Sequence, residues 1–371
     1  MRVPKLATRS LTVAGATMLL AGAVAAVASA APAADDRTGP AGPAARFTVS
    51  GDLRGVAAVS GSNAWAVGYA GSAADPKTLI VHWNGAAWKR VPSPSPGTGS
   101  YLDGVAALSA RDAWAVGSYH AGNVSRTLIL RWNGTAWKKA PGPSGVLSGV
   151  AVTSARSAWA VGDAGRYPDD RTLILRWNGT AWKKVPSPSP GSGDVLSGVA
   201  AISAGSAWAV GCTRCFSEVF KTLIERRNGQ TWRRAHSLSP RPDATLAGVA
   251  AASGRSAWTF GCTASCNQTL IEKWNGTAWK KVPSPGRAGY VIAGMAAVSA
   301  VSAWAVGFTG AKAWVERWDG GVWKQVRVPA TTGSSYLSGV AAVSARRAWA
   351  VGCTDYCTKT LALRWNGTAW T

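Results

Sequence analysis

Histidine, methionine and acidic residues are scarce in this 371-residue chain. There are three histidines, three methionines and 17 acidic residues, against 40 lysines and arginines. His82, His120 and His236 occupy unrelated places, and the sequence has no nucleophile elbow, phosphate-binding loop or His-x-x-x-His pair. A catalytic set needs different side chains in different roles, and hence a break in any regular pattern. We therefore predict that the protein is not an enzyme, with no catalytic residue, metal ion or cofactor.

The chain does have a repeat of about 45–50 residues. It runs L-x-G-V-A-A-V-S, then A-W-A-V-G, then T-L-I-x-R-W-N-G, then T-A-W-K-K-V-P-S-P. The tryptophan of the A-W step recurs at spacings of 45 to 50 residues, at Trp65, Trp114, Trp159, Trp208, Trp258, Trp304 and Trp349. A fixed period in this range, with several short strands in each unit, is typical of a solenoid or a propeller.

Each repeat predicts four short antiparallel strands. In the second repeat they fall at 102–109, 113–117, 127–132 and 135–140, with a hairpin at Asn133-Gly134 and prolines after the fourth strand. The small residues of the first strand suit a crowded position at the axis, and the Trp-Lys-Lys strand should lie outermost. Four such strands per unit make a propeller blade. We therefore predict an all-β, seven-bladed β-propeller.

The ends of the chain divide it into three parts. Residues 1–30 have a basic start, an apolar stretch and an Ala-Ser-Ala cleavage pattern, as in a secretory signal peptide. An uncleaved membrane anchor is the alternative for this stretch. Residues 31–45 have the composition of a disordered spacer. The propeller is predicted over 46–371, with blades at about 53–97, 102–143, 147–191, 196–240, 246–286, 292–330 and 337–371.

Ring closure is predicted from the two ends of the repeat array. The last repeat stops at Trp370-Thr371, before any K-K-V-P-S-P, and the first is preceded by residues 46–50, which have strand composition. We expect residues 46–50 to complete the outer strand of the last blade, which would remove two exposed sheet edges. Deleting them should then lower the melting temperature sharply.

The hairpin sequence resembles a known motif. N-G-T-A-W is similar to the Asp-box hairpin of sialidase-type propellers, and residues 319–323 come closest, although Trp-Asn replaces the serine and aspartate of that motif in most copies. Over about 46–371 the repeat also resembles the kelch-like and Trp-Asn-Gly repeats of secreted actinobacterial proteins. The resemblance implies the propeller fold and export, and no particular activity.

Six cysteines form three local pairs. Each pair follows the A-W strand of its repeat, at Cys212/Cys215, Cys262/Cys266 and Cys353/Cys357. An even number of cysteines in an exported chain predicts disulfides. Two pairs together could instead form a four-cysteine zinc site. Only one pair has the two-residue spacer and no histidine accompanies any of them, which favours disulfides.

The net charge of +23 predicts anionic partners. Residues 1–30 hold three basic and no acidic residues, so their removal leaves +20. This charge favours cell-surface polymers and would bind nucleic acid only non-specifically. Many of the cations should form a basic rim on the outer strands, at Lys89, Arg90, Lys138, Lys139, Lys183, Lys184, Arg233, Arg234, Lys280, Lys281 and Lys324. Lysines at a sheet edge also block strand addition, which is sufficient as a structural explanation.

The tryptophans and most acidic residues are interpreted structurally. The A-W tryptophans should pack between blades, and the other tryptophans should pair across the hairpins. Glu225, Glu272 and Glu316 share one strand position and precede basic residues, which suggests interblade ion pairs. A glycan-cleaving enzyme would instead need two carboxylates at a cleft near the axis. Asp163, Asp169 and Asp170 share a loop and could hold calcium, although their spacing matches no common calcium loop.

Sequence diversity is concentrated in the loops between the second and third strands. These loops differ in every repeat, whereas the turns on the other face are nearly constant. Variable loops on a rigid scaffold are typical of a binding surface. We predict a secreted binding or scaffold module, free or attached to the cell wall, with no membrane span in the mature chain. Its ligand would be a surface polymer, glycan or protein; the alternative is a secreted enzyme of the glycosidase or lyase type. The predicted contacts are Tyr69, Tyr119, His120, Tyr167, Phe216, Phe220, Phe308 and Tyr356.

Overall fold

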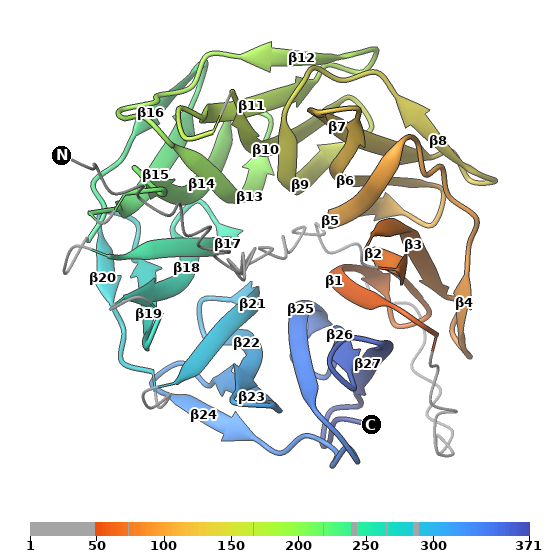
Figure 1. The fold of residues 1–371 in the computed structure, drawn as a ribbon. Coiled ribbons are helices and arrows are strands. Elements are labelled where there is room, and N and C mark those ends of the chain that lie inside the picture. Colours follow the sequence, from red (N-terminus) through yellow and green to blue (C-terminus); the bar gives the residue numbers. More distant parts are fainter. Residues whose placement is uncertain are drawn as a thin grey trace, which may run out of the picture.

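The computed structural model describes residues 49–72, 74–165, 167–217, 219–238, 243–263, 266–284 and 289–371. The predicted signal peptide (1–30), the predicted spacer (31–45) and residues 46–48 of the predicted closing segment lie outside this part of the chain. The described residues form seven sheets around a common axis (Figure 1). Within each sheet, neighbouring strands are antiparallel, and the described residues form no helix. The predicted seven-bladed propeller is therefore confirmed.

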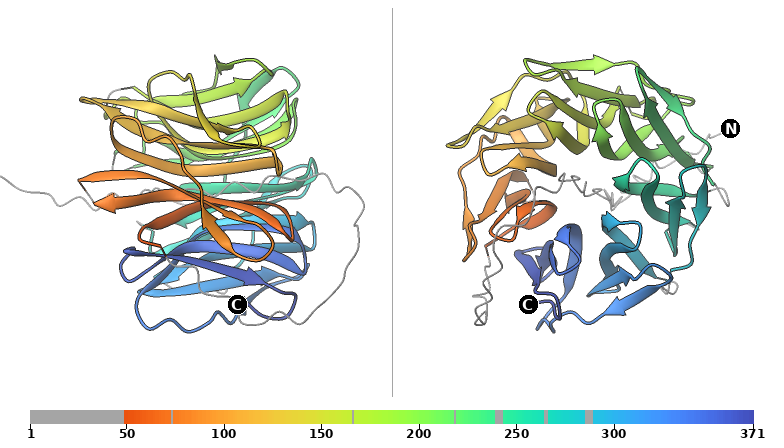
Figure 2. Two further views of the ribbon diagram at one scale, coloured as in Figure 1. Left: turned by 90° about the vertical axis from the view of Figure 1, so that its right-hand side faces the viewer. Right: turned by 180° about the vertical axis from the view of Figure 1, so that it is seen from behind.

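The strands follow one another outward from the axis in each blade, and in side view they cross from one face of the ring to the other (Figure 2). Blade one comprises β1 (Asp52–Ser60), β2 (Asn63–Ser72), β3 (Asp75–Trp83) and β4 (Trp88–Arg90). Blade two comprises β5 (Thr98–Ser109), β6 (Asp112–Ala121), β7 (Val124–Trp132) and β8 (Trp137–Ala140). Blade three comprises β9 (Val146–Ser154), β10 (Ser157–Ala164), β11 (Arg171–Trp177) and β12 (Trp182–Val185). Blades four and five comprise β13 (Val195–Ser203), β14 (Ser206–Thr213), β15 (Lys221–Asn228), β16 (Thr231–Arg234); β17 (Thr245–Ser253), β18 (Ser256–Thr263), β19 (Gln268–Trp274) and β20 (Trp279–Lys281). Blades six and seven comprise β21 (Tyr290–Ser299), β22 (Ser302–Thr309), β23 (Lys312–Trp318), β24 (Trp323–Val326); β25 (Ser335–Ser344), β26 (Arg347–Thr354) and β27 (Lys359–Trp365).

A β-bulge lies near the start of every inner strand. In blade two the register passes from Leu102↔Gly117 to Gly104↔Val116, which leaves Asp103 as the extra residue. Gly117 permits this geometry, because a Cβ there would lie 2.1 Å from the carbonyl oxygen of Tyr101. Bulges redirect the side chain of the extra residue. The glycine of the A-W-A-V-G sequence therefore helps to decide which residue of the inner strand faces the axis.

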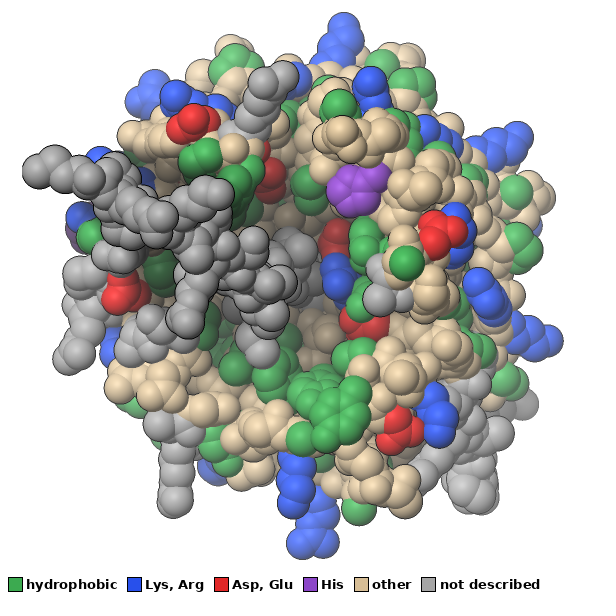
Figure 3. Space-filling view, in the orientation of Figure 1, with side chains coloured by type: hydrophobic (Ala, Val, Ile, Leu, Met, Phe, Trp, Pro, Cys, Tyr) green, Lys and Arg blue, Asp and Glu red, His purple; other side chains and the backbone are tan. Residues whose placement is uncertain are grey.

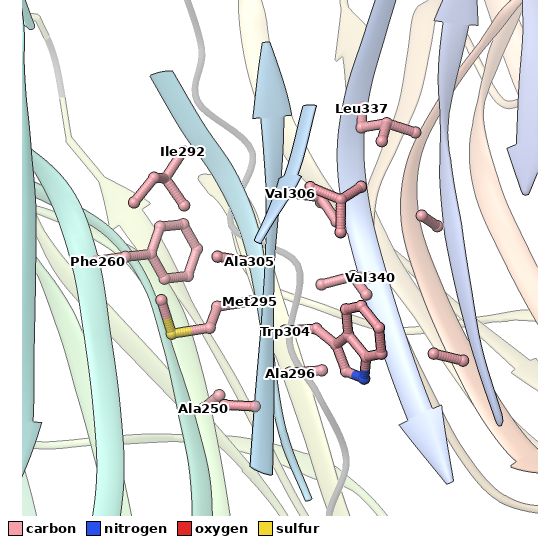
Figure 4. Packing of buried hydrophobic residues seen from close by; sticks show 14 of the residues in the cluster. Ala250, Phe260, Ile292, Met295, Ala296, Trp304, Ala305, Val306, Leu337 and Val340 are labelled. Carbon is pink, nitrogen blue, oxygen red and sulfur yellow. The ribbon is translucent and has the colours of Figure 1, made fainter. Parts of the chain in front are cut away.

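The A-W tryptophans are buried between adjacent blades, as predicted. Trp114 of blade two meets the rings of Trp177 and Trp182 of blade three at centroid distances of 4.9 and 5.1 Å. The guanidinium carbon of Arg131 lies 5.1 Å from the ring centre of Trp114 and 5.4 Å from that of Trp177. The basic residue of the R-W-N-G sequence therefore makes cation–π contacts across the blade interface. Figure 4 shows Trp304 buried between two blades, with Val340 of the next blade beside it.

The hairpin tryptophans face each other across the outer turn, which confirms the predicted pairing. Trp132 pairs in register with Trp137 at a centroid distance of 5.8 Å. The turn differs from the tight Asn-Gly hairpin expected from the sequence, because four residues separate the paired tryptophans. The Asn133 side-chain oxygen accepts hydrogen bonds from the backbone N–H groups of Thr135 and Ala136. This Asx-type turn uses the asparagine as an acceptor, so the outer strand begins at Trp137.

In blade four, an arginine replaces one hairpin tryptophan. Arg227 is buried and its guanidinium carbon lies 4.6 Å from the ring centre of Trp159 in blade three. Its Nε donates to the carbonyl of Ala204, just as the indole N–H of Trp177 donates to the carbonyl of Ala155 in blade three. The arginine thus reproduces both the stacking and the hydrogen bond of the missing tryptophan.

Blade seven has three regular strands, and its outer position is shared by both ends of the described chain. Thr371 exchanges two backbone hydrogen bonds with Arg364, at 2.8 and 2.9 Å. At the other end of β27, the Thr360 N–H donates to the Val49 carbonyl at 2.9 Å, and the Gly51 N–H donates to the Thr358 carbonyl at 3.1 Å. Residues 49–51 therefore hold part of the outer edge of β27. Closure by the whole segment 46–50 stays a prediction.

An open seam lies between these two contacts. In blade two, residues 139–142 span the equivalent stretch of the outer edge. No described residue pairs with β27 there, and a cavity of about 1010 Å³ extends along this edge, lined among others by Ala362, Trp370 and Val49.

Candidate functional site

A second cavity, of about 1120 Å³, opens at the axis on the face that carries the variable loops. We call it the mouth pocket. It is lined by the first residues of the inner strands and by the loops that follow the second strands, including Arg54, Asp103, Ser148, Phe216 and Tyr356. Figure 3 shows this face, with acidic and basic side chains side by side at the edge of a central hollow.

The seven bulge residues form a ring around the mouth pocket, which we call the bulge ring. Its members are Arg54, Asp103, Ser148, Ser197, Ala247, Ala293 and Ser338. The first five line the pocket. The ring breaks the symmetry of the repeat, because it is charged in blades one and two, hydroxylated in blades three and four and apolar in blades five and six. Sequence reasoning missed this site, although the variable residue of L-x-G, compared across the repeats, carried the signal.

Arg54 is the centre of a charged cluster at the edge of the mouth pocket. Its Nη1 lies 2.6 Å from Asp103 Oδ1 in the next blade, and its Nε lies 3.5 Å from Asp52 Oδ2. The guanidinium carbon also lies 4.7 Å from the ring centre of Tyr69 and 5.7 Å from that of Tyr101. Two carboxylates and two aromatic rings hold this planar group in one orientation. Such pre-organisation favours directional hydrogen bonding to a ligand.

The electrostatics of the cluster follow from its burial. Burial raises the pKa of Asp52 above its usual range, although the nearby Arg54 partly opposes the rise. Burial disfavours the charge of Arg54, but Asp103 and Asp52 outweigh that effect and raise its pKa further above neutrality. Arg54 therefore stays charged, and its charge is compensated inside the cluster.

Asp52 also lies close to a disulfide. Its carboxylate and the sulfur atoms of Cys353 and Cys357 lie within 4.8 Å of one another. The two sulfurs are bonded to each other, so neither is the thiolate that a metal ion needs. Asp52 Oδ1 has no hydrogen-bond partner among the described residues. These residues do not fit a metal site.

The predicted binding residues divide into three groups. Tyr69, His120, Phe216, Phe220 and Tyr356 line the mouth pocket. Tyr167 packs edge-to-face against Phe216 at a ring-centroid distance of 4.8 Å and so lies beside it. Tyr119 and Phe308 are not among the lining residues: Tyr119 accepts a hydrogen bond from Lys139 on the outer strand, and Phe308 packs on Tyr336.

The acidic loop of blade three lies at the pocket margin. Burial, together with the charge of Asp170, raises the pKa of Asp163 to about 7, and Asp163 lines the mouth pocket. Asp194 is a buried acceptor in the same region and takes hydrogen bonds from Thr213, Ser189 and two backbone N–H groups. Its role is structural. The calcium alternative for Asp163, Asp169 and Asp170 gains no support from this arrangement of bonds.

Glu225, Glu272 and Glu316 lie in the interior of the blades, which corrects the prediction of interblade ion pairs. All three are fully or almost fully buried, and no ion pair involves them within the described chain. Both carboxylate oxygens of Glu225 and Glu272 lack hydrogen-bond partners, and Ser284 donates to Glu316. Burial raises their pKa values to about 8, 7 and 7. The basic neighbours stack on tryptophans instead, as Arg226 does on Trp208.

The predicted cysteine pairs and the basic rim have clear structural positions. Cys212–Cys215, Cys262–Cys266 and Cys353–Cys357 are disulfides, and they sit at the ends of β14, β18 and β26. Zinc coordination by these cysteines is therefore incorrect. The rim residues lie on the outer strands, and all of them are exposed. Among the described residues, no helix has the length and apolar character to span a bilayer. Disulfides are compatible with an extracellular protein.

The fold defines a seven-bladed β-propeller with a pocket on its axis. No family model and no curated protein sequence matches the chain. Among solved structures, YCF48 bound to a D1 peptide is 14% identical with a TM-score of 0.57, over 85% of this chain and 94% of that one. The RRP9 WD40 repeats are 12% identical with a TM-score of 0.57, over 81% and 87% of the two chains.

An enzyme also shares the architecture. The GH74 xyloglucanase from Xanthomonas campestris is 16% identical with a TM-score of 0.51, over 74% of this chain and 45% of that one. At these identities the likeness shows the propeller fold alone. The relation to kelch-like actinobacterial repeats stays a prediction.

Proposed function

We propose that this protein is a secreted binding module whose ligand enters the mouth pocket. One observation carries the proposal: the side chains that break the sevenfold repeat gather where the bulge ring and the variable loops meet. Arg54 and Asp103 have no charged counterpart in the other blades, and Phe216 and Tyr356 extend from loops that differ in every repeat. A rigid scaffold with a concave, chemically unique site is the usual arrangement for ligand recognition.

The basic rim has a separate role in this proposal. Its lysines and arginines are exposed on the outer strands and none of them lines the mouth pocket. Exposed cations attract anionic polymers through a force that salt screens. We propose that the rim holds the protein near an anionic cell envelope, and that the pocket supplies a contact that salt does not screen. Nucleic acid would bind to the rim only without sequence preference.

Co-sedimentation with isolated cell envelopes across a salt series tests these two roles separately. We expect one bound fraction that disappears between 0.05 and about 0.3 M NaCl, and a second that persists. Added salt reduces the gain from counterion release, and this gain drives only the contacts between exposed charges and polymer. Replacing the blade-one loop, residues 69–77, with the shorter blade-six loop, residues 308–312, should remove the persistent fraction. The matched control Lys183→Ala/Lys184→Ala should reduce only the salt-sensitive fraction. Binding that disappears entirely with salt would contradict a role for the pocket.

A glycan-cleaving enzyme is the second candidate, and one observation favours it. Asp103 and Asp163 both line the mouth pocket; Asp103 is paired with Arg54, and the pKa of Asp163 is raised to about 7. Glycoside hydrolysis uses two carboxyl groups, one as an acid and one as a base or nucleophile, and both residues carry a carboxyl group in this pocket. We favour binding, because the ion pair with Arg54 already engages Asp103. Release of reducing ends from envelope polysaccharide, lost in both Asp103→Asn and Asp163→Asn, would establish the enzyme instead.

A further inference from the structure

The charged side chains of the cluster around Arg54 are largely compensated by one another, and burial favours the neutral form of Asp163, a further acidic residue in the lining, by raising its pKa to about 7. Asp103 and Asp52 both contact the Arg54 guanidinium, which is also enclosed by Tyr69 and Tyr101. An anionic ligand would therefore approach two carboxylates, and a cationic ligand would have to compete with an arginine that is already in place. Burial makes either exchange costly, because a charge that loses its partner in a partly dry site is left without compensation from solvent. The pocket is thus best suited to a ligand without net charge.

The pocket nevertheless offers many hydrogen-bonding groups. Ser148 and Ser197 belong to the bulge ring, and neither hydroxyl has a hydrogen-bond partner among the described residues. Each hydroxyl can both donate and accept, whereas the remaining N–H groups of Arg54 can only donate and Asp103 can only accept. A ligand that satisfies this mixture must itself present groups that donate and accept at closely spaced positions.

Exposed aromatic side chains lie around the entrance. Tyr356 is 81% exposed, Tyr167 is 75% exposed and Phe216 is 45% exposed. These are the three aromatic members of the set of exposed large hydrophobic residues, and all three lie on the variable loops. Exposed rings at the opening of a polar pocket provide flat apolar surfaces on which a ligand can stack.

From these three features we infer that the mouth pocket binds a neutral carbohydrate chain. This inference rests on the proposed function and specifies its ligand. Sugar rings carry no charge, present vicinal hydroxyls that donate and accept together, and have C–H faces that pack on aromatic rings. In this arrangement Arg54 and Asp103 bind hydroxyls at the axis, Ser148 and Ser197 extend the contact, and Tyr356 and Phe216 stack on rings nearer the entrance. The volume of about 1120 Å³ exceeds that needed for a single sugar.

Chemical treatment of isolated envelopes distinguishes a glycan from a protein ligand. The purified protein is mixed at 0.5 M NaCl, where the rim no longer contributes, with envelopes treated with periodate, which cleaves vicinal diols, or with a protease. We expect periodate to abolish binding and protease to leave it unchanged. Loss after protease alone would overturn the glycan inference while the proposed binding function stands. No binding to untreated envelopes at this salt concentration would overturn both.

Variants of the pocket test whether these residues make the contact. Tyr356→Ala and the double change Ser148→Ala/Ser197→Ala should each weaken salt-resistant binding by about tenfold, as expected for one lost stacking contact or a pair of lost hydrogen bonds. Val322→Ala, which changes another exposed apolar position in a hairpin turn on the opposite face, is the matched control and should bind normally. Melting temperatures confirm that all variants are folded. Periodate-sensitive binding that none of the pocket variants weakens would assign the glycan contact to another surface and overturn the inference.

Discussion

Replacing Glu225, Glu272 and Glu316 together with leucine should stabilise the protein by several kcal/mol at pH 8, on the order of 5 kcal/mol. All three carboxyls are buried, and their pKa values are raised to about 8, 7 and 7. Leucine already occupies the same strand position in blades two and three, as Leu130 and Leu175. Removing a buried acid without a charged partner therefore removes a cost and introduces a side chain that the fold is known to accept.

The raised pKa values of the three carboxyls make the free energy of unfolding depend on pH. The carboxyls ionise near pH 4.5 in the unfolded chain and near pH 7–8 in the folded one. Between these values the folded state holds more protons, so the free energy of unfolding falls as pH rises. Full stability is present below about pH 4.5 and is lost progressively up to about pH 8. Relaxation and water entry around each ionised group limit the loss, which keeps the total below the sum of the three shifts.

Chemical denaturation between pH 5 and pH 8 measures the effect. The wild-type free energy of unfolding should decline across this range relative to the triple leucine variant, whose profile lacks the contribution of these carboxyls. The triple glutamine variant, which keeps the volume without the charge, is the control and should follow the leucine variant. Parallel profiles for wild type and both variants would mean that the three carboxyls remain ionised in the folded protein.

A chain that begins at Gly51 should melt about 4–5 °C lower than one that begins at Arg46. The shorter chain loses Val49 and Ser50, which hold the outer edge of β27 through bonds to Thr360 and Lys359. Val49 also packs against the core shared by blades one and seven. Each lost backbone bond costs about 1 kcal/mol, so the whole contact contributes on the order of 3 kcal/mol. Differential scanning calorimetry of the two chains makes the comparison.

The chain that begins at Arg46 is the control, because it lacks residues 1–45 and keeps the whole closing segment. It should melt at the temperature of the full-length protein. Equal melting temperatures for all three chains would contradict closure by residues 46–50 and would leave the outer edge of β27 open to another partner.

Fold prediction succeeded because the repeat encodes the blade seven times. Each blade needs packing tryptophans, a turn asparagine in the hairpin and prolines after the outer strand. These features lie close together in the sequence, so they can be recognised within a single repeat. Blade four shows the limit of such reasoning, because Arg227 fills the place of a tryptophan by stacking on Trp159 and reproducing its hydrogen bond. Blade four therefore keeps the structure of the other blades although its sequence departs from the repeat at this position.

The candidate site was predicted only in part, because it is assembled across blades. The variable loops indicated the face on which the mouth pocket opens, and Tyr69, Phe216 and Tyr356 line that pocket. Arg54 and Asp103 are separated by one full repeat, and only the packing of adjacent blades brings them to 2.6 Å. The bulge that turns them toward the axis depends on a glycine in the neighbouring strand, a relation that strand periodicity alone does not reveal. Similarly, the sequence suggested interblade ion pairs for the three glutamates, whereas the structure buries them inside the blades without such pairs among the described residues.

Photo-crosslinking from the two faces of the ring tests the pocket most directly. A photoreactive phenylalanine analogue replaces Tyr356 at the mouth in one variant and Val322 in an opposite hairpin turn in the other; both positions are exposed. Each variant is irradiated with isolated envelopes at 0.5 M NaCl. If the mouth pocket is the binding site, the variant at position 356 forms a covalent adduct with envelope material and the variant at position 322 does not. Adducts from position 322 alone, or equally from both, would contradict binding by the mouth pocket.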